Sequence, residues 1–439
     1  MRIAHLPTTA FLWALMLTPN LCHASGIKVE NVTVINRMDV LNTPLAVQFD
    51  ISWENAWHND KNHDAAWVFM KYGGQWNNQV HFTEDGHKII LNRSRVAKPT
   101  IKLSPEKNGF FLYAGKSFRG DVNLRILMQI DTSKTNPSYN QMNNLKVFGL
   151  EMVYVPEGPF TLGSPDLASI SRASLYKSDE NGNPSGLIRI TSKGAIQVAA
   201  REDSLYYWSE EDLYNGDQKG PVPAGFPKGY EAFYVMKYEL SQGQYAAFLN
   251  TLPDSWTFQR SPTGGKDYHK KRGGIHFKNG KYAAENPDRP MNFVSFTDGL
   301  AFTDWACLRP ITELEYEKAA RGPGEPLPSE FVWGTSSYEK LERMTNLDGE
   351  LIFQGDLDES MLSDETKERL GASYYWVMDL SGSLWEKVIT IGNPIGRAFK
   401  GTHGDGKLDF GHATNEDWPT SDDEIGGFGY RGGAFMQEG

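Results

Sequence analysis

The cysteines set the first limit on the chemistry of this chain. Its 439 residues contain two of them, Cys22 and Cys307. Because Cys22 lies in a predicted signal peptide, cleavage leaves Cys307 as the only thiol and no intrachain disulfide can form. A lone cysteine in an apolar helical segment is usually a small buried hydrophobic residue. We therefore expect no catalytic role for Cys307.

Residues 57–64 form a second stretch with metal-binding chemistry. The stretch contains two imidazoles and two carboxylates, from His58, Asp60, His63 and Asp64. No fixed spacing of metal ligands is met, so we interpret it as a polar loop between strands. The Gly-rich stretch 401–407 is likewise interpreted as a surface loop, because a phosphate loop needs Ser or Thr after its lysine and a strand–loop–helix context.

Composition and charge narrow the class of partner. The net charge is −11, and no cluster of Lys and Arg is present, so we do not expect a nucleic-acid partner. The length predicts two domains, since it exceeds what one core normally supports. An aromatic fraction of 12%, with 43 Gly and 23 Pro, favours short strands and long ordered loops.

The N-terminus has the pattern of a secretory signal peptide over residues 1–24. Arg2 precedes an apolar run at 10–17, and small residues stand before Ser25. A lipid anchor on Cys22 is the rival interpretation, but residues 19–21 are a poor approach to a lipidated cysteine. We expect an exported protein, periplasmic, at the cell surface or extracellular, with no later segment able to cross a bilayer.

Residues 25–148 are predicted to form an all-β sandwich. Apolar residues alternate with polar or small ones, which is the period of a strand with one buried face. The two clearest series are Leu45, Val47, Phe49, Ile51 and Trp53, and Val122, Leu124, Ile126, Met128 and Ile130. Several short strands separated by turns make an immunoglobulin-like sandwich the expected fold.

Residues 149–439 show mixed helix and strand signals, with a polar insertion at about 166–229 that we expect to have little core of its own. Three helices are predicted from capping pairs in which a hydroxyl precedes a polar residue by three positions. The pairs begin at Ser241, at Ser295 or Thr297, and at Thr312; Gly322 supplies the stop for the last helix. Residues 379–386 then form an aromatic loop with carboxylates at both ends.

These blocks, in this order, resemble the sulfatase-modifying-factor family, whose founding activity is that of the formylglycine-generating enzyme. The resemblance implies a C-type-lectin-like α+β fold with much irregular structure over residues 149–439. It rests on the stretches 152–156, 160–164, 238–245, 290–296, 308–322, 333–334, 379–386 and 430–435.

The resemblance implies copper held by two thiolates in the oxidase members of the family. Here Gln437 stands where the first thiolate is expected, and a neutral amide cannot replace a thiolate as a Cu(I) ligand. We therefore expect no copper, and whether the chain is an enzyme stays open. Family members continue with a further strand, so we expect either a fragment with a truncated C-terminus or a domain that closes in another way.

The resemblance also implies calcium in the loop 379–386. Asp379 and Glu386 would supply carboxylates, and Gly382 and Leu384 carbonyl oxygens, which are hard ligands suited to Ca²⁺. The alternative is a plain turn in which Trp385 packs. Two residues differ from the usual pattern, Ser383 and Lys387. A second calcium site would begin at Asn346 and the carbonyl of Leu347.

Three functions follow as expectations. The first is an exported, calcium-stabilised member of this family that binds a peptide, protein or glycan without oxidising it. The second is an oxygen-dependent metalloenzyme of the same family whose catalytic end lies outside this chain. The third is a structural or adhesive protein of the bacterial envelope.

Overall fold

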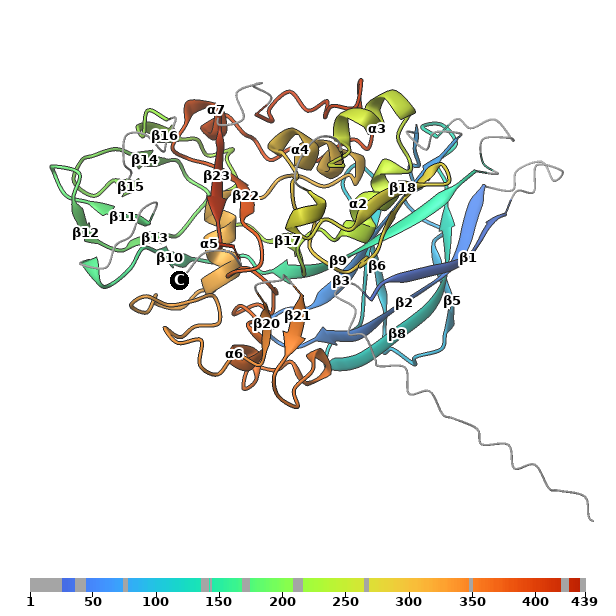
Figure 1. Cartoon of the computed structure of the whole chain (residues 1–439), viewed down its shortest axis with the longest axis horizontal. Coiled ribbons are helices and arrows are strands. Elements are labelled where there is room, and N and C mark those ends of the chain that lie inside the picture. Colours follow the sequence, from blue (N-terminus) through green and yellow to red (C-terminus); the bar gives the residue numbers. More distant parts are fainter. Residues whose placement is uncertain are drawn as a thin grey trace, which may run out of the picture.

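The structure is a computed structural model that describes residues 26–35, 45–73, 78–135, 142, 144–167, 174–207, 216–263, 268–346, 350–419 and 426–434. In these residues strands far outnumber helices (Figure 1). No helix among them is long and apolar enough to cross a membrane.

Two antiparallel sheets enclose the first core. The first sheet has the strand order β1-β2-β8-β5, and the second has the order β17-β9-β3-β7-β6, with β4 paired to β3. Their bounds are β1 Lys28–Ile35, β2 Ala46–His58, β3 Asp64–Tyr72, β4 Asn78–Gln79, β5 Lys88–Asn92, β6 Thr100–Leu103, β7 Gly109–Tyr113, β8 Phe118–Gln129, β9 Lys146–Val155 and β17 Phe233–Met236.

The alternating apolar residues point into this core, as the sequence predicted. In the register of β2 and β8, Phe49 lies opposite Ile126 and Ile51 opposite Leu124. All four side chains are buried, and they pack with residues of β3 and β7 from the facing sheet. The period-2 pattern therefore identified the inner face of both strands.

The central strand of the second sheet, β3, is buried on both faces. All nine residues of β3 are buried. Val68 and its alternate neighbours face the first sheet, whereas Phe69 packs on the other side, with its ring centroid 5.0 Å from that of Trp305. This sheet also crosses residue 148, the predicted domain boundary, because β9 pairs with β3 and β17 pairs with β9.

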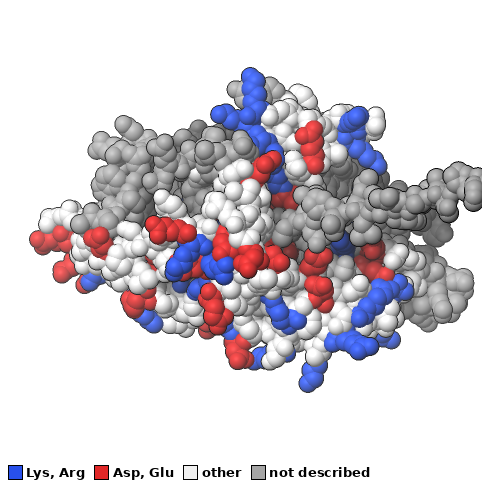
Figure 2. All heavy atoms as spheres, turned by 60° about the horizontal axis from the view of Figure 1, so that its bottom comes forward, with Lys and Arg blue, Asp and Glu red and all other residues white. Residues whose placement is uncertain are grey.

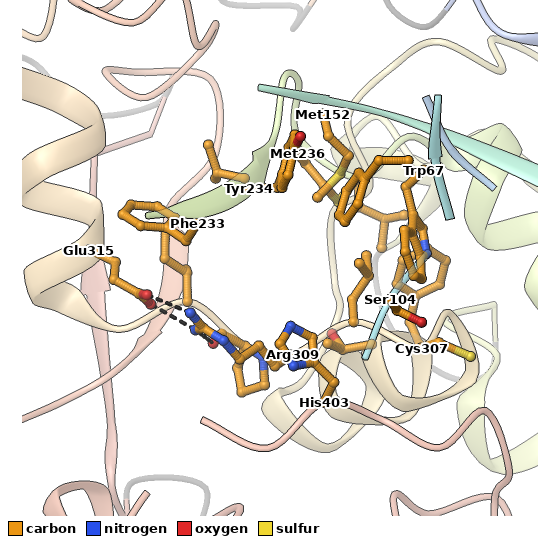
Figure 3. Close-up of a pocket in the computed structure, with 18 of the residues that line it drawn as sticks. Trp67, Ser104, Met152, Phe233, Tyr234, Met236, Cys307, Arg309, Glu315 and His403 are labelled. Carbon is orange, nitrogen blue, oxygen red and sulfur yellow. Dashed lines mark hydrogen bonds and ion pairs between the residues drawn. The ribbon is translucent and has the colours of Figure 1, made fainter. Parts of the chain in front are cut away.

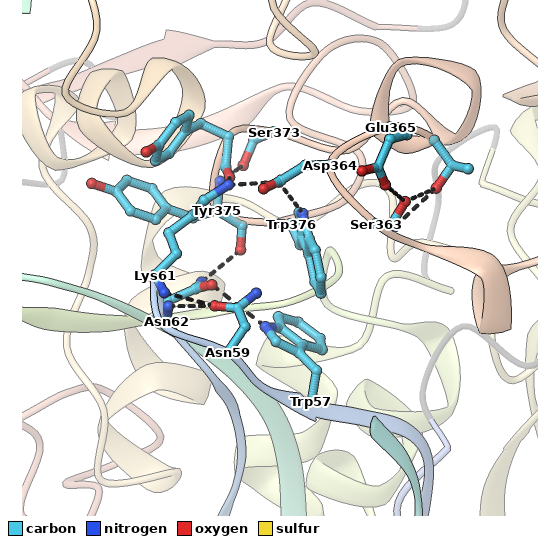
Figure 4. A network of polar contacts seen from close by, with 12 residues as sticks. Trp57, Asn59, Lys61, Asn62, Ser363, Asp364, Glu365, Ser373, Tyr375 and Trp376 are labelled. Atoms are coloured by element: carbon cyan, nitrogen blue, oxygen red, sulfur yellow. Dashed lines mark hydrogen bonds and ion pairs between the residues drawn. The ribbon is translucent and has the colours of Figure 1, made fainter. Parts of the chain in front are cut away.

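A polar loop after β2 ties the first core to residues 364–376 (Figure 4). Asn62 donates to the carbonyls of Tyr154 and Tyr375 at 3.2 and 2.8 Å. Lys61 forms an ion pair with Asp364 at 2.6 Å. The polar loop predicted at 57–64 is shorter in the structure, because β2 extends to His58 and β3 begins at Asp64. Among the described residues no three His, Cys, Asp or Glu side chains are arranged to hold a metal ion.

The insertion contains more structure than the sequence indicated. It forms a sheet of order β12-β11-β15-β14-β16, and β13 pairs with β10 of the flanking chain. Buried residues such as Leu175 and Val222 share a core with Leu314 and Phe428. The core of the insertion is thus shared with the flanking chain. Its strands of three or four residues are too short to show a period in the sequence. The bounds are β10 Phe160–Leu162, β11 Leu175–Ser178, β12 Pro184–Gly186, β13 Ile188–Ile190, β14 Ile196–Val198, β15 Leu205–Tyr207 and β16 Gly220–Val222.

The three predicted capped helices are present. Each begins after a hydroxyl residue whose side chain accepts from the backbone N–H three residues on, and that third residue bonds back. Ser295, not Thr297, caps the middle helix. These helices are α2 Gln242–Leu249, α4 Phe296–Trp305 and α5 Glu313–Arg321.

Shorter elements complete the described chain, and the antiparallel pair of β22 and β23 lies beside α5 (Figure 1). Their bounds are α3 Asp254–Arg260, η2 His269–Lys271, β18 Ile275–Lys278, β19 Lys281–Ala284, β20 Arg343–Thr345, β21 Leu351–Phe353, η3 Glu359–Met361, α6 Lys367–Leu370, β22 Glu386–Ile389, α7 Pro394–Arg397 and β23 Phe428–Arg431.

Candidate functional site

The loop 379–386 is held in an unusual backbone conformation. Asp379 and Ser383 have φ angles of 62° and 58°, a region that costs non-glycine residues free energy and recurs at functional sites. Tyr316 of α5 donates its hydroxyl to the Leu380 carbonyl. The Gly382 N–H donates to the Gly432 carbonyl at 2.8 Å. Helix α5 and the residue that follows β23 therefore hold the loop in place.

Asp379 is neutralised by a buried guanidinium. Arg343 donates to both carboxylate oxygens of Asp379, at 2.7 and 3.1 Å, and to Glu359 at 3.0 Å. A bidentate pair of this kind is among the stronger charge-assisted contacts in proteins. In this arrangement the first of the predicted calcium ligands is occupied by an ion pair.

Glu386, in contrast to Asp379, has no partner for its carboxylate among the described residues. Both of its carboxylate oxygens are buried, and neither receives a hydrogen bond within the described part of the chain. Burial raises the pKa of Glu386 well above its ordinary value, and the nearby Glu239 and Asp379 raise it further. The carboxylate lies against Gly432, where a Cβ would overlap its Oε2 atom. A buried carboxylate without donors requires a proton or a cation.

Glu239 is a third carboxylate at this loop, and the sequence reasoning missed it. It accepts from the Ser383 hydroxyl at 2.6 Å and from the Leu384 N–H at 2.8 Å. Burial and Asp379 raise its pKa well above the ordinary value, against these hydrogen bonds. Glu239 stands two residues before the Ser241 cap, but nothing in that spacing shows that it reaches a loop some 145 residues away.

The side chains predicted to bind calcium in the loop 379–386 therefore differ in how well they could hold a cation. The buried oxygens of Glu386, which accept no hydrogen bond from the described residues, suit a hard cation. Asp379, by contrast, is paired with Arg343. At the second predicted site, the Asn346 side-chain oxygen accepts from the Glu350 N–H at 2.9 Å, and Leu347 lies outside the described residues.

Cys307 has none of the properties of a thiolate ligand. It follows α4 with a φ of 57°, just beyond the helix on which the sequence placed it, and only 1% of its surface is exposed. Burial raises the pKa of its thiol to about 12, so the thiol stays protonated. It is the only cysteine among the described residues, and Gln437 lies outside them. The one thiol in the described residues therefore does not suit a copper ligand.

A cavity of about 1380 Å³ lies between the second sheet and α4 and α5 (Figure 3). Its sheet side carries aromatic rings from four strands. Tyr234 stacks on Phe111, with centroids 3.8 Å apart and an interplanar angle of 13°, and lies 5.1 Å from Tyr154. The Tyr234 hydroxyl is 2.9 Å from Nε2 of His63. Rings from residues 45–148 and from the later part of the chain therefore form one aromatic surface.

The opposite wall of the cavity carries a paired charge. Arg309 donates to both oxygens of Glu315, at 2.8 and 2.5 Å, and Figure 3 shows this pair next to His403. The cavity also reaches Leu384, Trp385 and Glu386 of the loop 379–386. On the face drawn in Figure 2, acidic and basic side chains are interspersed without a large field of one sign.

Comparisons with known proteins give one strong match. The family model described as the sulfatase-modifying factor enzyme 1-like domain matches residues 140–431. Formylglycine-generating enzyme from Bos taurus is 23% identical over 199 residues, which cover 38% of this chain and 51% of that protein; the chain thus spans about half the length of this relative. The pilus backbone protein RrgB from Streptococcus pneumoniae matches at 9% identity with a TM-score of 0.17, over 45% of this chain and 57% of that one, a likeness too low to support an argument.

Proposed function

Since the chain belongs to the sulfatase-modifying factor family, we propose that it is an exported, non-oxidising member that binds a peptide, protein or glycan ligand. The observation that carries this proposal is the state of its one described thiol. Cys307 is buried and its raised pKa keeps it protonated. The second cysteine of the sequence, Cys22, belongs to the predicted signal peptide.

The chemical argument concerns the ligands of monovalent copper. Cu(I) is held by soft sulfur, and the residue at the expected thiolate position is Gln437. An amide oxygen is a hard, neutral donor. The family motifs are present up to the turn at 430–435, and Gln437 at the expected position of the first thiolate favours recognition of a ligand over its oxidation.

The test is a reaction with a cysteine-containing peptide. The purified protein would be incubated with Cu(I), oxygen and the peptide, and the peptide mass followed over time. We expect no mass change and no Cu(I) retained against a chelator of micromolar affinity. Oxidation of the peptide with stoichiometric copper on the protein would refute the non-oxidising role and favour the metalloenzyme alternative.

We further propose that calcium binds at the loop 379–386. Asp379 and Glu386 would hold it through carboxylates, and Gly382 and Leu384 through carbonyl oxygens. The support comes from Glu386, whose two buried oxygens have no donor in the described residues. A hard dication there would compensate the charge that burial disfavours. We propose a second calcium site that begins at Asn346 and the carbonyl of Leu347.

We also propose an immunoglobulin-like sandwich for the first part of the chain and a C-type-lectin-like α+β fold for the rest. Two facing antiparallel sheets with a shared core support an immunoglobulin-like interpretation of the first part. The irregular chain with a few short helices after residue 148 supports the C-type-lectin-like α+β interpretation. Export rests on the apolar N-terminal run of the sequence, and electrophoresis of cell fractions with N-terminal sequencing of the mature protein would test it.

A further inference from the structure

Lys237 and Glu151 form an ion pair at the second sheet. Nζ of Lys237 lies 2.6 Å from a carboxylate oxygen, Oε1, of Glu151, and only 3% of either side chain is exposed. We propose that this pair condenses to an amide in the folded protein, so that a covalent isopeptide bond joins the two side chains. The bond would form within the chain itself, so it does not depend on the ligand-binding role proposed above.

The strand order brings the reacting groups to one face of the sheet. Strand β9 lies between β17 and β3. The Lys237 N–H donates to the Glu151 carbonyl at 3.0 Å, so these two residues stand opposite each other just beyond the end of β17. On the other side of β9, Ala66 pairs with Glu151, and Asp64, two residues earlier on β3, points to the same face. Lys237, Glu151 and Asp64 therefore share one face of the sheet.

The groups that an acyl transfer needs are present. Lys237 supplies the amine and Glu151 the carboxyl carbon. The backbone N–H of Gly26 donates to the Glu151 carboxylate, where it can stabilise the oxyanion that forms on attack. Asp64 is fully buried and interacts electrostatically with both partners. Burial raises the pKa of Asp64 to about 7, so at neutral pH this group can both donate and accept a proton.

The reaction releases one molecule of water. Burial lowers the pKa of Lys237, but the surrounding acids raise it by more, so the ammonium first passes a proton to Oε1 along the hydrogen bond. The neutral Nζ then attacks Cδ of Glu151 and forms the new bond. Asp64 takes a second proton from the nitrogen and gives its own proton to Oε1. The Cδ–Oε1 bond breaks, water leaves, and Asp64 returns to its starting state.

Burial favours the amide over the ion pair. Two charges taken out of water can lose more in hydration than their attraction returns, whereas a neutral amide carries no such penalty. Well-oriented intramolecular groups react at effective concentrations of about 10⁵–10⁸ M, and the short contact holds this amine beside this carboxyl group. The rings of Trp57 and Tyr238 have their centroids 5.1 and 4.9 Å from Nζ. They help to exclude water, which the reverse reaction, hydrolysis, requires.

An amide at this position would close a long loop of the chain. Its two ends are 86 residues apart, and the loop between them contains β10 to β16 and therefore the insertion. Cross-links that close long loops restrict the unfolded chain the most. The described residues contain one cysteine, so no disulfide within them can hold these segments together. The amide would supply that restraint.

Mass spectrometry of the full mature chain, purified in its folded form and then denatured, tests the inference. We expect a mass lower than that of the sequence by one molecule of water. Trypsin does not cut after an acylated lysine, so digestion should yield one branched peptide in which Lys237 is linked to Glu151. Lys237→Arg keeps the charge but cannot form this bond, and should have its full sequence mass. Asp64→Asn removes the proton relay and should lower the cross-linked fraction by about tenfold or more.

The matched control is the ion pair of Lys61 and Asp364. Its distance is also 2.6 Å, but its side chains are 19% and 55% exposed, so we expect no branched peptide there, and Lys61→Arg should still lose one water. The full sequence mass for the folded wild type overturns the inference, whether or not Lys237→Arg folds. A loss of water that maps to any other pair of residues does so as well. Neither result bears on the non-oxidising role, which the reaction with the cysteine peptide tests.

Discussion

Arg343 binds Asp379 through two hydrogen bonds of 2.7 and 3.1 Å, although 36 residues separate them in the chain. The guanidinium is 3% exposed and also contacts Glu359. Glu359 in turn accepts from the Tyr238 hydroxyl. One buried network of hydrogen bonds therefore connects Asp379, at the start of the loop 379–386, to Arg343 of β20 and Glu359 of η3.

Removal of this guanidinium should be costly. Arg343→Ala leaves Glu359 and Asp379 buried without their partner, and we expect a loss of about 3–5 kcal/mol in the free energy of unfolding. Urea titration followed by circular dichroism measures it. The control is Arg189→Ala, whose ion pair to Glu325 has side chains 51% and 71% exposed and should matter by less than about 0.5 kcal/mol. Equal effects would contradict the network.

Calcium should raise the melting temperature through Glu386. With calcium at about 100 times its Kd, the stabilisation of a site that exists only in the folded state is about 2.7 kcal/mol. In scanning calorimetry, Glu386→Gln should remove the contribution of the loop 379–386 to the difference between calcium and EDTA buffers, and Asn346→Ala should remove the contribution of the second site. A calcium response that is unchanged in Glu386→Gln would place the ion elsewhere.

Gly432 should tolerate no side chain. Its φ is 85° and a Cβ would clash with the Glu386 carboxylate, whereas Gly334, with a φ of 87°, has open space at the same position. Gly334→Ala should cost only the backbone strain of about 1 kcal/mol, and Gly432→Ala should cost more and weaken the calcium response. The free energy of unfolding of both variants is measured by chemical denaturation. The difference between the two losses gives the cost of the overlap with Glu386, because the backbone strain is common to both. Indistinguishable losses would show that the Glu386 side chain moves away freely.

Asp64 should make the protein less stable as the pH rises. Burial raises its pKa to about 7 against the opposing charge of Lys237, while the unfolded value is about 3.9. The folded state binds the extra proton between these values, so this contribution to stability is full below about pH 4 and falls as the pH rises to about 7. Asp64→Asn should flatten the slope of urea midpoints over this range. An unchanged slope would assign the titration to Glu151 or another buried acid.

Cys307 should be unreactive in the folded protein. Its burial and raised pKa predict no labelling by a thiol reagent at pH 8 on the timescale of minutes, and one thiol per chain after unfolding in guanidinium. The absorbance of the thiolate that the reagent releases measures how many thiols react in the native and in the unfolded protein. Rapid labelling of the native mature chain would show an accessible thiolate and reopen the case for thiol chemistry.

Local features of the fold could be predicted from the sequence because their determinants are close together in the chain. A capping box needs only a hydroxyl and a polar residue three positions apart, and the boxes at Ser241, Ser295 and Thr312 all form. The alternation in β2 and β8 directly records which side chains are buried. The family resemblance likewise rests on motifs that can be read in order.

Contacts between distant segments were decided by the tertiary structure alone. The sequence does not show that Glu239 reaches Ser383, or that Tyr234 crosses the sheet to stack on Phe111, because both contacts depend on strand order and twist. It predicted Asp379 as a free ligand, whereas packing supplied Arg343 as its partner. Residue types and local spacing therefore determined the helices and the strand faces. The cavity and the charge state of the loop depend on which surfaces come together, and only long-range packing defines these.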